Sequence, residues 1–186
     1  MVNGEWIKTA LGVFFFGSGP LIRRAQGFGF ALVHSPLTIH AFPEMKYDKI
    51  IHSGRAGVFA APRLLGPLRA AAKRAGFAWF DLDLAGVRDG NAFLRRCAEV
   101  FPLPDYFGGN WDALHECMLD FAESGVSGVI VYWRRGRELV LHAPEAAATG
   151  LEILRDAATY WENTGRVFLV AVDRDSAPGQ TLRPLR

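Results

Sequence analysis

The chain has 186 residues, of which 50% are hydrophobic, 12% are aromatic and 22% are charged. This composition excludes a disordered chain, which would be poor in aromatic residues and high in net charge, and it excludes collagen-like and low-complexity proteins. The length fits one ordinary domain with an appendage. The only two cysteines, Cys97 and Cys117, form neither a disulfide framework nor a metal-binding spacing. We expect both to be reduced thiols in the core.

The net charge of +2 hides an uneven distribution along the sequence. Residues 1–75 contain ten basic and three acidic residues, residues 76–173 contain eight and fifteen, and the tail 174–186 contains three and one. Between Cys97 and Trp133 there are six acidic residues and no lysine or arginine. Such an asymmetry bears on the binding partners of a protein and not on its fold.

Residues 1–44 contain scattered glycine, proline and phenylalanine without a lasting helical or strand period. We interpret them as a poorly defined N-terminal extension, which would be an artefact if translation starts at Met45. The longest apolar run there, Ala10–Gly17, is much shorter than the roughly 20 residues that cross a bilayer. Glu5 does not fit the basic start of a signal peptide. We therefore expect no membrane contact and a cytoplasmic location.

Residues 45–75 form the expected entry to the domain. The sequence predicts a short extended piece at Gly57–Ala61 and then a helix that begins near Pro67 and ends before Gly76. No further element is assigned within this segment.

Strands and helices then alternate over residues 76–173, the predicted main domain. The patterns predict strands at Phe77–Leu84, Val129–Trp133 and Val167–Val172, and helices at Asn91–Phe101, Trp111–Ala122 and Pro144–Asn163. Arg134–His142 stays open between a hairpin and a plain loop. The alternation indicates an α/β fold in which helices flank a small parallel sheet. Residues 174–186 are a C-terminal tail.

The predicted helix Trp111–Ala122 carries the candidate site. On a helical wheel its apolar residues face the core, whereas Asp112, Glu116 and Asp120 form a stripe on the opposite side at positions i, i+4 and i+8. Exposed helices usually place a basic residue four positions from an acid, and this helix has none, so its carboxylates repel one another. A solvated face is the ordinary interpretation of this stripe, and a cationic partner is the functional one.

The segment Pro104–Leu119, with the sequence PDYFGGNWDALHECML, resembles the signature of the barstar family of ribonuclease inhibitors. A weaker likeness, in the order of the elements, spans residues 77–173. The resemblance implies a three-stranded parallel sheet flanked by helices. It also implies a bacterial protein, without enzymatic activity, that blocks the basic active site of a ribonuclease. We expect this protein to be a monomer when free.

The same resemblance implies the residues that contact the partner. They are Tyr106, Phe107, Gly108, Asn110, Asp112, His115, Glu116 and Asp120. Tyr106 would stack in the nuclease pocket, Gly108 would allow a tight turn, and Asn110 would cap the helix. Alternatively, Tyr106 and Phe107 cover the core and do nothing else.

Two of these positions depart from the family pattern. Glu116 stands where the family usually has Asp, and His115 stands where the best-known relative has Trp. The family has a further acid on its last helix, where the corresponding region here offers Thr159 or Tyr160, with Asp156 nearby. These departures bear on which ribonuclease would be inhibited.

Other functions have weaker support in the sequence. Catalysis lacks a nucleophile with a facing base, because His115 and Cys117 are two positions apart on a helix, and we expect neither a metal nor a cofactor. Direct nucleic-acid binding would use the basic helix that contains Arg69 and Lys73, yet the acidic half repels phosphate. The remaining alternative keeps the fold. It is an interaction or regulatory module that binds another basic protein without inhibiting a ribonuclease.

Overall fold

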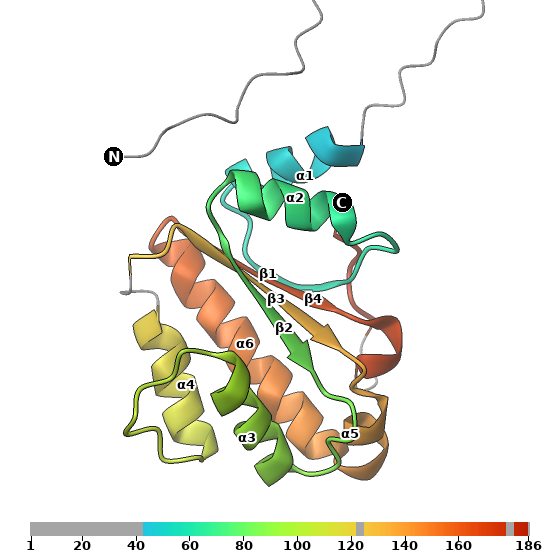
Figure 1. The fold of residues 1–186 in the computed structure, drawn as a ribbon, viewed down its shortest axis with the longest axis vertical. Helices are drawn as coiled ribbons and strands as arrows, with labels where there is room; N and C mark the ends of the chain where they lie inside the picture. The colour runs from blue at the N-terminus through green and yellow to red at the C-terminus, as the bar shows by residue number, and fades with distance from the viewer. Residues whose placement is uncertain (1–42, 122–124, 178–180, 186) are drawn as a thin grey trace, which may run out of the picture. The chain divides into compact units, whose positions relative to one another are not determined.

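A four-stranded, fully parallel sheet organises the protein in the computed structural model, which describes residues 43–121, 125–177 and 181–185. Figure 1 shows the strands in the spatial order β1 (Gly57–Ala60), β4 (Val167–Val172), β3 (Gly128–Arg134) and β2 (Ala78–Asp83). The two inner strands, β4 and β3, are almost continuously buried. Their apolar sequences are those expected of strands that are covered on both faces.

The sheet has four strands, whereas the sequence predicts three. The additional strand is β1, which pairs with β4 so that Gly57 lies opposite Leu169 and Ala60 lies opposite Val172. Phe59 supplies the energetic reason, because its ring is buried against the helices on one face of the sheet. The extended piece expected at Gly57–Ala61 is therefore an edge strand.

Helices cover both faces of the sheet (Figure 1). One face packs against α1 (Pro43–His52) and α2 (Gly66–Arg74). The other packs against α3 (Gly90–Val100), α4 (Trp111–Asp120) and α6 (Pro144–Asn163). The described bounds of α2, α3, α4 and α6 fall within two residues of the predicted helices. The α/β architecture with a parallel sheet flanked by helices is confirmed.

Two helices are absent from the prediction. The segment before β1 forms α1, in which Tyr47, Ile50 and Ile51 recur at helical spacing and are buried. The segment Arg134–His142 contains neither a hairpin nor a plain loop, because its residues Arg137–His142 form α5. The left-handed backbone of Arg135, with φ of 56°, turns the chain out of β3 into this helix. Burial of Leu139 then holds α5 against the core.

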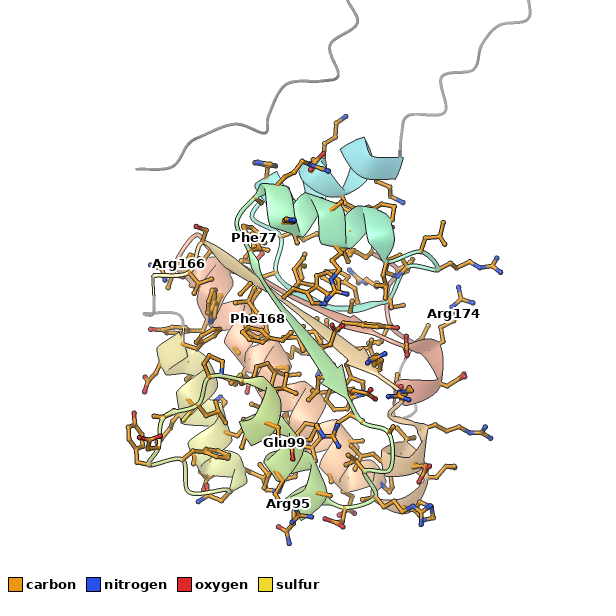
Figure 2. All side chains as sticks on the ribbon, viewed as in Figure 1. Phe77, Arg95, Glu99, Arg166, Phe168 and Arg174 are labelled. Atoms are coloured by element: carbon orange, nitrogen blue, oxygen red, sulfur yellow. The ribbon has the colours of Figure 1, made fainter. Side chains whose placement is uncertain are left out.

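The larger of the two hydrophobic clusters fills the space between the sheet and α3, α4 and α6. Its centre is aromatic, with the Phe93 ring centroid 5.2 Å from that of Trp133 and the Trp161 centroid 5.4 Å from that of Phe168. Gly150 permits the close approach of α6, because a Cβ atom there would lie 2.7 Å from Cζ of Phe93. Figure 2 shows Phe168 between the sheet and α6.

The expected N-terminal extension lies outside the described residues, apart from Pro43 and Glu44, which begin α1. A translation start at Met45 stays a prediction. Among the described helices, none is both long and apolar enough to cross a membrane.

Candidate functional site

A loop and the helix that follows it form the candidate site. The loop leaves α3 at Phe101, which is buried. The centroid of its ring lies 5.3 Å from the ring centroid of Phe80 on β2. A hydrogen bond from the Phe107 backbone N–H to the Pro104 carbonyl, at 2.9 Å, closes a turn within the loop. The loop is therefore anchored to the sheet at one end and to its own backbone in the middle.

Glycine is required in this loop at Gly109, whose φ is 64°. The sequence assigns the turn to Gly108, but φ of Gly108 is not positive. A Cβ atom at Gly108 would instead lie 3.3 Å from Nδ2 of Asn110, which is a tight contact. The two glycines thus have different roles, one in the turn and one in the approach to the helix cap.

Asn110 caps the site helix. Its backbone is extended, and its side-chain oxygen accepts a hydrogen bond of 2.8 Å from the backbone N–H of Ala113. This is the arrangement expected of a helix N-cap, because the first backbone N–H groups of a helix have no partner within it. Asn110 therefore fixes where α4 begins and how the loop meets it.

The three carboxylates of α4 are all exposed. Asp112, Glu116 and Asp120 lie opposite Leu114 and Met118, which are buried against the sheet. The stripe extends about 12 Å along the helix axis, at 1.5 Å per residue. Among the described residues, no ion pair involves any of the three acids.

The two aromatic residues of the loop point in different directions. Tyr106 is 79% exposed, which is the highest exposure among the large hydrophobic side chains of the described residues. Phe107 is partly buried and packs against the core. Tyr106 is thus available to a partner, whereas Phe107 holds the loop in place.

A cavity of about 220 Å³ separates the loop from the last turns of α4. Its walls are Pro102, Leu103, Pro104, Tyr106, Cys117, Met118, Asp120 and Phe121. The walls are largely apolar, with one carboxylate among them. The sequence gives no sign of this cavity, because it forms only when the loop folds back beside the helix.

His115 joins α4 to α6. Its Nε2 atom lies 3.6 Å from Oδ2 of Asp156, and both side chains are partly exposed. Asp156, which lies near the expected positions Thr159 and Tyr160 on the last helix, supplies an acid in contact with α4. The Thr159 hydroxyl donates instead to the Arg155 carbonyl, and the Tyr160 side chain is 40% exposed.

The pKa of the Cys117 thiol reflects the negative charge of this helix. Burial raises the pKa of its thiol, and the negative charges of Asp120 and Glu116 raise this pKa further. Such a thiol is a poor nucleophile at neutral pH. No group of three or more metal-ligating side chains occurs in the part of the chain that the structure describes.

The structure brings most of the predicted contact residues to one surface. Asp112, Glu116 and Asp120 line the exposed side of α4, Tyr106 lies in the loop before it, and His115 lies at the junction with α6. Figure 2 displays the side chains of this region on the loop and α4.

Comparison with known proteins identifies one family for this architecture. A family model described as Barstar (barnase inhibitor) matches residues 77–173, which is slightly more than half of the chain. The match begins with β2 and ends directly after β4, so it contains the loop, α4 and α6. No curated protein matches the chain.

Proposed function

The chain belongs to the barstar family, and we propose that it inhibits a bacterial ribonuclease by placing its acidic loop and helix in the basic active site of that enzyme. The observation that carries this proposal is the exposed stripe of Asp112, Glu116 and Asp120, with no lysine or arginine between Cys97 and Trp133. The family supports a protein partner, and the stripe supports a basic one.

The physical argument starts from the target. A ribonuclease active site must be basic, because it binds the phosphates of RNA. Carboxylates can occupy those phosphate positions, and the mutual repulsion that they suffer in the free inhibitor is relieved by the cations of the enzyme. Tyr106 adds an exposed ring beside the stripe, and its burial in the complex contributes a hydrophobic term.

The site also supports a target that differs from the one bound by family members with Asp at the central position. Glu116 reaches one methylene further from the helix than Asp would. His115 is smaller than Trp and is engaged with Asp156 at 3.6 Å. We infer that the target offers a deeper cationic pocket opposite Glu116 and a flatter surface opposite His115.

The remaining parts of the proposal follow from the same reasoning. The protein acts as a binding partner and not as an enzyme, it acts in the bacterial cytoplasm as a monomer until it meets its target, and it uses neither a metal nor a cofactor. The acidic stripe does not bind RNA itself, because it repels phosphate.

Titration of the protein into a ribonuclease assay tests the proposal. We expect stoichiometric inhibition of a guanyl-specific ribonuclease, weaker at high salt because the contacts are charge pairs. Asp112→Asn and Glu116→Gln should each weaken inhibition by roughly 30-fold or more, which corresponds to about 2 kcal/mol for a charge pair that is removed from water in the complex.

Glu99→Gln is the matched control. It removes one exposed carboxylate from α3, where Glu99 pairs with Arg96 at 3.1 Å, and it should leave inhibition unchanged. If no guanyl-specific ribonuclease is inhibited at stoichiometric dose, inhibition is the wrong function. Salt-sensitive binding to another basic protein, lost in Glu116→Gln, would then identify an interaction module. An equal effect of all three variants would show that the stripe is not the contact surface.

A further inference from the structure

A cavity larger than the one beside α4 is lined by other segments of the chain. It has a volume of about 810 Å³ and is open at the carboxyl ends of the parallel strands. Its walls come from the segments that follow β1, β2, β3 and β4. They are Ala61, Pro62, Arg63, Leu65, Ala85, Tyr132, Arg135, Arg137, Glu138, Asp173, Arg174, Asp175 and Ser176.

The topology of the sheet explains why a cavity forms there. After β1 the chain turns to α2 on one face of the sheet, and after β3 it turns to α5 and α6 on the other face. The two connections diverge on either side of β4, which lies between β1 and β3. In open α/β sheets, small ligands bind in the crevice where neighbouring connections diverge in this way.

The floor of the cavity is held by hydrogen bonds. The Tyr132 hydroxyl donates to Asp173 at 2.7 Å, and the Gly136 backbone N–H donates to Oγ of Ser176, also at 2.7 Å. Ser176 is fully buried, and it is the one buried polar residue among those described. Burial, together with the hydrogen bond to Asp173, raises the pKa of Tyr132 to about 12, so its hydroxyl keeps its proton at neutral pH.

Several charges around the cavity already have partners. Arg135 is hydrogen-bonded to Asp83, with Nε at 2.7 Å from Oδ1, and Glu138 is paired with Arg88 at 2.6 Å. Asp173 accepts from the Tyr132 hydroxyl and from the Arg135 backbone N–H. Arg135 and Glu138 are thus paired with opposite charges, whereas Asp173 accepts hydrogen bonds from neutral donors and keeps its negative charge.

Three arginines remain. Within the described residues, no hydrogen bond or ion pair is made by the side chains of Arg63, Arg137 and Arg174, and the acidic wall residues Asp173 and Asp175 have no cationic partner. The arginines come from three different segments, which follow β1, β3 and β4. They line one cavity and do not run along one helix, and all three are exposed. Their three positive charges exceed the two negative charges of Asp173 and Asp175 in the same wall, which favours an anionic ligand.

We propose that this cavity binds a small phosphate-bearing molecule, with Arg63, Arg137 and Arg174 as the groups that hold the phosphate. The planar guanidinium group matches phosphate oxygens with two parallel hydrogen bonds. The volume lies within the range of sites for ligands of nucleotide size, about 300–1,000 Å³. Ala61, Pro62 and Leu65 supply an apolar wall for the rest of such a molecule.

Calorimetric titration of the full chain with pyrophosphate and with ADP tests this proposal. Pyrophosphate presents the anion alone, and ADP adds a nucleoside. We expect saturable binding of at least one of them, weakened about tenfold or more in the double variant Arg137→Ala/Arg174→Ala, since each arginine contributes a charged hydrogen bond. Binding of ADP in preference to pyrophosphate would place the nucleoside against the apolar wall.

Arg95→Ala is the matched control, because Arg95 is an exposed arginine on α3 that lines no part of this cavity. Figure 2 shows Arg174 and Arg95 on well-separated parts of the molecule. Failure of both probes to bind overturns the proposal. So does binding that the double variant leaves unchanged, binding that Arg95→Ala weakens equally, or binding of single-stranded RNA when both small probes fail. None of these variants alters the α4 stripe, so the result is independent of ribonuclease inhibition.

Discussion

The caps of α3 and α4 form a matched pair through which the site helix can be tested. Asp89 and Asn110 both have extended backbones, and each accepts a hydrogen bond from the backbone N–H three residues later, at 2.7 Å from Ala92 and 2.8 Å from Ala113. Asp89→Ala and Asn110→Ala should each lower the free energy of unfolding by about 1 kcal/mol. For a chain of this size that lowers Tm by about 2–4 °C.

Thermal unfolding followed by circular dichroism measures both losses. Asn110→Asp keeps an acceptor at the cap and should stay within about 0.5 kcal/mol of the wild type. Asn110→Ala should lower the affinity for the partner more than Asp89→Ala does, because only Asn110 sets the start of the helix that carries the stripe. A loss of stability in Asp89→Ala but not in Asn110→Ala would refute the cap assignment. Equal losses of affinity would show that binding depends on global stability and not on the position of α4.

Three further measurements examine the core and the charges. Gly150→Ala should lower the free energy of unfolding by about 1 kcal/mol in chemical denaturation, because overpacking against Phe93 outweighs the gain in helix propensity; an unchanged or raised value would contradict the close approach of α6. The Arg135 hydrogen bond lowers the pKa of Asp83, so the stability it contributes is complete above about pH 5 and is lost as pH falls through the lowered pKa of the folded state. Wild type and Asp83→Asn should therefore converge in acid, and a constant difference would refute this. Asp120→Asn should lower the pKa of Cys117 and speed its alkylation at a given pH; an unchanged rate would mean that the charge does not reach the thiol.

Much of the fold can be predicted from sequence because its signals are local. The burial of β3 and β4 appears as continuous apolar runs, and the start of α4 appears as a capping residue before an amphipathic segment. α5 has no such signal. It is only six residues long, it follows a left-handed Arg135, and its stability comes from burial of Leu139 in a core built by other elements. Whether such a short helix forms depends on its tertiary packing.

Some features of the candidate site can likewise be predicted from the sequence, and others cannot. The carboxylate stripe and the Asn110 cap follow from residue spacing within one helix. The contact between His115 and Asp156 joins residues on two helices, and the apolar cavity beside Tyr106 needs the loop to fold back on α4. Neither can be derived from spacing along the chain, because both depend on how α4 and α6 pack together.

The uneven charge of the sequence becomes an uneven distribution in space. The basic helix α2 and the formally neutral helix α1 cover one face of the sheet, and α4 lies over the other. The two faces differ in the sign of their charges and also in how far those charges are paired. On the basic face, Arg69 and Arg74 pair with Asp81 and Asp48 at 3.0 and 2.9 Å. The α4 stripe has no ion pair among the described residues. Because partly neutralised bases attract anions less than unpaired carboxylates attract cations, Arg69 and Arg74 attract an anionic partner less than the α4 stripe attracts a cationic one, although the net charge is +2.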